Sequence, residues 1–130
     1  MSSVKKWRVG FTRSAENDIH DILVFIADQD GPETAELILE KFIKARDTLQ
    51  ILPERGRIPP ELLQISVLSF REIQIPPYRM IYTIDRITSS VNIHIVVDGR
   101  RNFTEIIKEY LLNINSEANI IQFTHPPEVL

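Results

Sequence analysis

The sequence contains no cysteine among its 130 residues, which excludes disulfide bonds and thiolate metal ligands. Its three histidines, His20, His94 and His125, are too scattered to indicate a metal site. No apolar run approaches the roughly 18 residues that a membrane span needs. Residues 1–10 also lack the apolar core of a signal peptide. We therefore expect a cytoplasmic protein with no metal, no cofactor and no membrane partner.

The length of the chain and its charge pattern limit the number of domains and the class of partner. A chain of 130 residues favours one domain that buries its own core. The formal net charge of −3 argues weakly against nucleic acid as a partner. However, basic side chains gather in residues 1–13 and 71–101, whereas residues 14–52 are acidic. If the two basic segments meet in space, the protein has one basic face; otherwise the pattern reflects chance variation.

The first half of the chain predicts a strand and two helices. Residues 7–12, WRVGFT, alternate apolar and polar side chains, which indicates a short strand with one buried face. In residues 14–30 apolar side chains recur at helical spacing after Ser14, a good N-cap residue. Gly31 can end this helix, and Pro32 suits the first turn of the next. The short link favours an antiparallel helical hairpin.

The second half predicts three strands and a helix. Residues 65–75, 78–85 and 91–98 read ISVLSFREIQI, YRMIYTID and VNIHIVVD, which are β-prone and closely spaced. A final helix follows Asn102, which forms a capping pattern with Glu105. The predicted fold class is α+β: an N-terminal strand, an α-helical hairpin, a three-stranded antiparallel meander and a C-terminal helix.

Residues 113–130 follow the domain of residues 1–112 as a C-terminal extension. This segment is polar at first, then carries the apolar patch NIIQF, and then two prolines. Three interpretations remain open: a mobile tail, an added strand, or a segment docked on the domain.

The strands of residues 78–85 and 91–98 each predict one apolar face and one mixed face. The apolar sets should face the helices, whereas Arg79 on the mixed face should project into a shallow, concave surface of the sheet. The apolar sets are Tyr78, Met80, Tyr82 and Ile84, and Val91, Ile93, Ile95 and Val97.

Arginines lie at the ends of these strands. In an antiparallel meander the end of the third strand lies next to the start of the second, so Arg79 should neighbour Arg100 or Arg101. Arg71 could approach from the preceding strand. Such a convergence of positive charge favours an anionic partner. The alternative is a set of local ion pairs with the acids Glu72, Asp85 and Asp98.

The segments FREI, YRMIYTID and VNIHIVVDGRR, followed by a helix, resemble the RelE/ParE superfamily of bacterial toxins from type II toxin–antitoxin systems. The resemblance covers roughly residues 7–112, and its most specific part is the pair YRMIYTID and GRR at this separation. It implies a helical hairpin packed on a curved antiparallel sheet. It also implies a cognate antitoxin, and therefore a hetero-oligomer; a homodimer stays open.

The resemblance implies two kinds of target. RelE-like members cleave messenger RNA in the ribosome, whereas ParE-like members inhibit DNA gyrase and lack the full ribonuclease set. Arg79 matches the strand arginine of the superfamily, and Arg101, or else Arg100, matches its second arginine. These cations can stabilise the charge that develops on a reacting phosphate.

The proton-transfer roles of a ribonuclease are poorly matched. RelE-like enzymes place lysines where this chain reads FREIQI, and a tyrosine where it has Ile107; Tyr110 lies one turn further on. Glu72 is the candidate base. His94 is either a general acid or, as more often at such strand positions, a bystander. Asp98 replaces a histidine of many relatives and should weaken the attraction of the arginines for RNA.

We therefore expect a ParE-like toxin that binds a protein target such as DNA gyrase and is neutralised by a cognate antitoxin. Its target- or antitoxin-binding residues would be Arg71, Arg79, Arg100 and Arg101. One alternative is a ribosome-dependent ribonuclease whose catalytic residues are Arg79, Arg101 and Glu72. Another is an inactive relative that only binds an antitoxin.

Overall fold

A computed structural model describes residues 5–113 of the chain. The elements, in chain order, are β1 (Arg8–Phe11), α1 (Arg13–Asp30), α2 (Pro32–Leu49), α3 (Pro60–Leu63), β2 (Phe70–Ile75), β3 (Tyr78–Asp85), β4 (Ser90–Asp98) and α4 (Phe103–Asn113). The α+β class and the predicted order of elements are confirmed, and the short helix α3 is an addition. The predicted extension lies outside the described residues except for Asn113, the last residue of α4.

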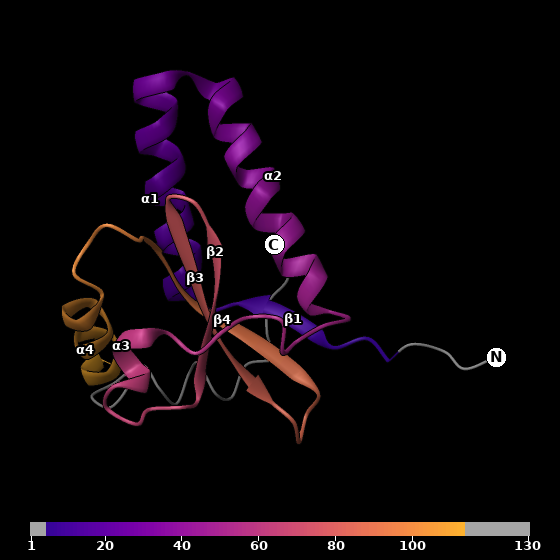
Figure 1. The fold of residues 1–130 in the computed structure, drawn as a ribbon. Helices are drawn as coiled ribbons and strands as arrows, with labels where there is room; N and C mark the ends of the chain where they lie inside the picture. Colours follow the sequence, from indigo (N-terminus) through magenta and orange to yellow (C-terminus); the bar gives the residue numbers. More distant parts are fainter. Residues whose placement is uncertain (1–4, 114–130) are drawn as a thin grey trace.

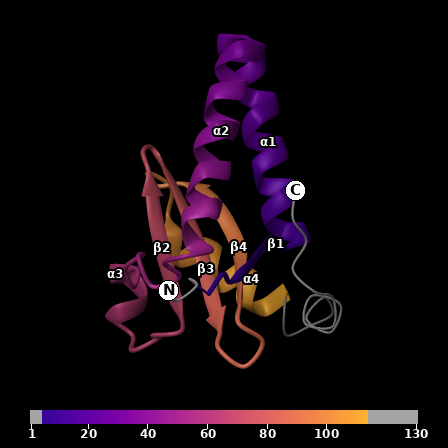
Figure 2. The same cartoon turned by 90° about the vertical axis from the view of Figure 1, so that its right-hand side faces the viewer.

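The four strands form one sheet in the order β1-β4-β3-β2 (Figure 1). The antiparallel meander of β2, β3 and β4 is confirmed. The first strand, β1, precedes the helical hairpin and pairs in parallel with the first half of β4. The hairpin of α1 and α2 stands on one face of the sheet and extends beyond its end (Figures 1 and 2). None of the helices in residues 5–113 is long and apolar enough to cross a membrane.

Local side chains set the ends of the hairpin helices. Thr12, and not Ser14, is the N-cap of α1, because β1 ends at Phe11 and the helix starts almost at once. The hydroxyl oxygen of Thr12 accepts a hydrogen bond of 3.2 Å from the backbone N–H of Ala15. Gly31, with a φ of +95°, ends α1 as predicted, and Pro32 opens α2.

Apolar side chains cover both faces of the sheet. The first core lies between the sheet and the hairpin and includes Phe11, Phe42 and Tyr82, all at most 2% exposed. The opposite face was predicted to be an open, mixed surface, and this prediction was wrong. A second core covers that face, with side chains from α3, α4 and the strands. It consists of Leu62, Phe70, Ile81, Ile95, Val97, Phe103, Ile107 and Tyr110.

A β-bulge in β4 accounts for part of this difference. Ile81 of β3 pairs with Ile95, but the next residue, Tyr82, pairs with Ile93, which leaves His94 as an extra residue. The alternation of side chains therefore shifts at His94.

The residues on the two sides of the bulge lie in different cores. Val91 and Ile93, before the bulge, face the hairpin as predicted. Ile95 and Val97, after the bulge, lie in the second core, so the prediction that they share the hairpin face was wrong. Strict alternation continues only in an unbroken ladder.

Candidate functional site

Arg79 lies near the start of β3, and its side chain is buried in the second core. The residue is only 7% exposed. Its guanidinium carbon lies 4.3 Å from the centre of the Phe103 ring, in a cation–π contact with α4. The prediction that Arg79 projects into an open surface was therefore wrong, because α3 and α4 cover this face of the sheet.

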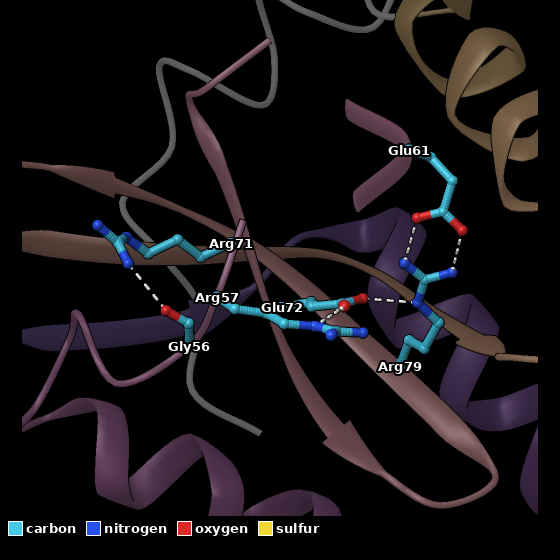
Figure 3. Close-up of polar contacts among 6 residues, drawn as sticks. All are labelled: Gly56, Arg57, Glu61, Arg71, Glu72 and Arg79. Atoms are coloured by element: carbon cyan, nitrogen blue, oxygen red, sulfur yellow. Dashed lines mark hydrogen bonds and ion pairs between the residues drawn. The ribbon is translucent and has the colours of Figure 1, made fainter. Parts of the chain in front are cut away.

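Two carboxylates of the protein itself bind the Arg79 guanidinium (Figure 3). Its Nε donates to an oxygen of Glu72 at 2.6 Å. Its two terminal nitrogens donate to the two oxygens of Glu61 at 2.9 and 2.8 Å, the bidentate geometry typical of strong arginine–carboxylate pairs. These bonds from Arg79 are the main reason why the pKa of Glu61 is lowered.

Glu72 joins a second arginine to this group. Its other carboxylate oxygen accepts a bond of 2.7 Å from Nε of Arg57. The Glu72 side chain is fully buried, whereas the Arg57 side chain is 55% exposed. We call Arg57, Glu61, Glu72 and Arg79 the charge quartet; its two positive and two negative charges balance.

The backbone explains how these four residues meet. Glu72 pairs with Ile81 and Arg79 pairs with Gln74, so Glu72 and Arg79 are diagonal neighbours on one face of the β2–β3 ladder. Arg57 and Glu72 form an isolated β-bridge, with backbone hydrogen bonds of 3.1 and 2.7 Å.

The short helix α3 brings Glu61 to the quartet. Pro59 precedes the helix and Pro60 occupies its first turn. Leu62, only 1% exposed, anchors the helix in the second core. Glu61, beside it, reaches Arg79.

A cleft of about 320 Å³ lies beside the quartet. Gly99 forms part of its wall, and a Cβ at this position would lie only 3.2 Å from the Arg79 side chain. The absence of a side chain at Gly99 thus allows the stem of Arg79 to pass closely. The cleft is lined by Arg57, Pro60, Glu61, Gln74, Pro76, Pro77, Tyr78, Arg79 and Gly99.

The four predicted arginines do not form one cluster. Arg71 lies on the hairpin side of the sheet, opposite Tyr82 in the ladder, where it donates to the carbonyl of Gly56 at 2.8 Å (Figure 3). Arg71 therefore does not approach Arg79, and that expectation was wrong.

Arg100 and Arg101 follow the end of β4. Arg100 pairs with Asp98, which lowers the pKa of that carboxyl to about 2, and its side chain is 78% exposed. Arg101 is also exposed. The alternative of local ion pairs thus describes Arg79 and Arg100, whereas Arg101 presents its charge to solvent.

His94 is closed inside the second core. Its Nδ1 lies 2.6 Å from the hydroxyl of Tyr110, and its Nε2 lies 2.8 Å from the hydroxyl of Thr83. Burial lowers the pKa of His94 to about 4 and raises the pKa of Tyr110. Both side chains hold the core together and are not presented to a ligand. Within residues 5–113, no group of His, Asp and Glu side chains is arranged to hold a metal ion.

The buried, neutral state of His94 predicts a pH effect on stability. As the pH falls from 6.5 to 5.5, an unfolded chain protonates this imidazole, whereas the folded protein, with a pKa of about 4, does not. His94 should therefore lower the free energy of unfolding by about 1 kcal/mol over this range. Urea denaturation of the wild type and of His94→Gln at both pH values measures the effect.

Asp18 changes the free energy of unfolding with pH in the opposite direction. The wild type must therefore be compared with His94→Gln to isolate the effect of His94. Burial raises the pKa of Asp18 to about 6, so its folded form takes up a proton as the pH falls through 6. The exposed His20 offers the control variant His20→Gln. If the free energy of unfolding depends on pH in the same way for His94→Gln and for His20→Gln, the proposed effect of His94 is wrong.

Two members of the charge quartet were not predicted from the sequence. Arg57 and Glu61 lie in a segment rich in proline and glycine, without helical or strand periodicity. The segment RIPPE does place an arginine and a glutamate four residues apart. That spacing alone does not indicate that both residues meet β2 and β3.

A family model described as the ParE toxin of the type II toxin–antitoxin system, parDE, matches residues 9–103. The chain belongs to the ParE toxin family. Solved structures of low sequence identity share the fold of this ParE-family toxin. No curated protein sequence matches it.

The first similar structure is the chromosomal ParDE toxin–antitoxin system from P. aeruginosa, with a TM-score of 0.59 and 18% identity over 72% of this chain and 97% of that chain. The second is the RelBE2 toxin–antitoxin complex from Mycobacterium tuberculosis, with a TM-score of 0.50 and 21% identity over 75% of this chain and 97% of that chain. At these identities the two structures establish the common fold.

Proposed function

We propose that this ParE-family toxin arrests bacterial growth by binding DNA gyrase, without cleaving RNA, and that a cognate antitoxin neutralises it. Membership of the ParE family supports the toxic role. The two similar structures are described as a toxin–antitoxin system and a toxin–antitoxin complex, which supports an antitoxin partner. The toxin would act in the cytoplasm, where gyrase and the antitoxin are found.

The observation that carries the proposal is the occupied guanidinium of Arg79. Cleavage of RNA through its 2′-hydroxyl requires a base, an acid and cations that can contact the phosphate. Arg79 is bound by Glu61 and Glu72 and covered by Phe103. Glu72, the candidate base, is fully buried between Arg57 and Arg79. The geometry therefore favours a toxin that binds its target over one that cleaves RNA.

Induced expression in a bacterial host tests the proposal. Inhibition of gyrase stops DNA synthesis first, so thymidine incorporation should fall early, while methionine incorporation continues. Co-expression of the neighbouring small open reading frame should restore growth, and its product should co-purify with the toxin.

The other outcomes point to the alternative functions. An early loss of methionine incorporation with continued DNA synthesis would support a ribosome-dependent ribonuclease. The absence of any growth arrest would indicate an inactive relative that only binds an antitoxin.

A further inference from the structure

Glu61 and Arg57 are the accessible members of the charge quartet, whereas Glu72 and Arg79 are buried. The Glu72 side chain is 0% exposed and the Arg79 side chain is 9% exposed, whereas the Glu61 side chain is 35% exposed. Glu72 is therefore fixed by its surroundings. Glu61 is the one carboxylate of the quartet that an incoming group can reach from solvent.

The support for Glu61 is also slight. It lies on α3, a helix of four residues whose anchor in the core is Leu62. The next residue, Leu63, is 55% exposed. A rotation of the Glu61 side chain away from Arg79 would leave that anchor in place, since Leu62 packs independently of the carboxylate.

The cleft beside Glu61 offers room and further contacts for a peptide. Arg57 reaches its wall with a half-exposed side chain that donates to Glu72. Pro76 and Pro77 add apolar surface from the β2–β3 turn. The lining is therefore mixed, and its charged groups, which can fix the orientation of a bound segment, lie beside apolar surface.

We propose that this cleft is a carboxylate-binding site, at which an acidic side chain of a partner protein replaces Glu61 on Arg79. The inference rests on the proposed function, because it assumes that the toxin acts through protein partners, and it assigns one docking point to them. Glu61 occupies the site in the free protein as an internal substitute for the carboxylate of the partner.

The charges of the quartet favour a carboxylate over a phosphate. Exchange of Glu61 for another single negative charge leaves the local balance unchanged. A phosphate monoester carries about −1.5 to −2 charges at pH 7 and would lie close to the buried Glu72 carboxylate. The planar, bidentate edge of Arg79 that Glu61 now occupies also matches a carboxylate.

The exchange by itself gives no surplus of binding energy, because one carboxylate replaces another. The affinity must come from the additional contacts that the partner makes with Arg57 and with the apolar surface of Pro76 and Pro77. Removing the internal competitor should therefore expose the binding capacity of the site.

The variant Glu61→Gln tests the proposal, since it retains the size of the side chain and removes its charge. The probe is the capped peptide Ac-Ala-Glu-Ala-NH2, titrated at constant ionic strength while the Nε–H signal of Arg79 is followed by NMR. Loss of a charge-assisted competitor should tighten binding about tenfold relative to the wild type. The control Glu40→Gln makes the same charge change on the exposed side of α2 and should bind as the wild type does.

Three results would overturn the proposal: equal affinities for Glu61→Gln and Glu40→Gln, equal binding of Ac-Ala-Gln-Ala-NH2, or tighter binding of inorganic phosphate than of the peptide. If Glu61→Gln unfolds, Glu61→Ala serves as the second variant, with the same expectations. If the peptide titration fails while the protein still arrests growth, only the carboxylate site is refuted. If the peptide binds as expected but the protein does not arrest growth, only the proposed function is refuted.

Discussion

Replacing Glu72 with alanine is expected to lower the free energy of unfolding by about 3–5 kcal/mol. The Glu72 carboxylate is fully buried and bonds to both Arg79 and Arg57. Its removal leaves the buried guanidinium of Arg79 with Glu61 as its remaining carboxylate partner. Urea denaturation followed by circular dichroism measures the loss.

Two further variants separate the loss of the ion pair from the loss of side-chain volume. Glu40→Ala removes an exposed glutamate and should change stability by less than about 1 kcal/mol. The double variant Glu72→Leu with Arg79→Met removes both buried charges and should recover much of the stability, because apolar groups of similar size often replace buried ion pairs well. If Glu72→Ala costs no more than Glu40→Ala, the charge quartet does not stabilise the fold.

Replacing Gly56 with alanine is the other substitution with a large expected effect. A Cβ at Gly56 would lie 2.5 Å from the backbone oxygen of Glu72 and 2.6 Å from the hydroxyl of Tyr82. Neither group can move freely. Glu72 is held by its β-bridge to Arg57, and the Tyr82 hydroxyl donates to the carbonyl of Pro53 and accepts from the N–H of Gly56. We expect a loss of about 3 kcal/mol in the free energy of unfolding.

Gly99→Ala provides a graded comparison. Its Cβ would meet the side chain of Arg79 at 3.2 Å and the carbonyl of Pro77 at 3.1 Å, both less severe than the contacts at Gly56. Thermal unfolding should therefore rank the variants as wild type, Gly99→Ala and Gly56→Ala, in order of falling stability. If Gly56→Ala is as stable as Gly99→Ala, the β-bridge between Arg57 and Glu72 can shift to make room for the new side chain.

The elements that alternate or repeat strongly could be predicted from the sequence. The periodicity of α1 and α2, the turn at Gly31 and Pro32, and the strand YRMIYTID all depend on neighbours along the chain. The bulge at His94 could not be predicted, because VNIHIVVD continues to alternate through it. The short helix α3 was also missed, since one turn gives no recurring apolar spacing.

The candidate site was predicted only in part. The sequence placed Arg79 on the face away from the hairpin, and it suggested Glu72 as one of its possible partners. It did not reveal that α3 and α4 cover this face, or that Glu61 and Arg57 complete the quartet. These contacts join residues 15–18 positions apart, through a segment whose path depends on where Leu62 is buried.

This ParE-family toxin holds Arg79 with its own carboxylates, and we propose that it acts by binding its target. The most direct test adds the purified protein to two assays side by side: gyrase supercoiling of relaxed plasmid, and a translation extract in which a reporter messenger RNA is mapped for cleavage. The account predicts loss of supercoiling with an intact messenger RNA. Cleavage of the translated messenger RNA while supercoiling continues would contradict it.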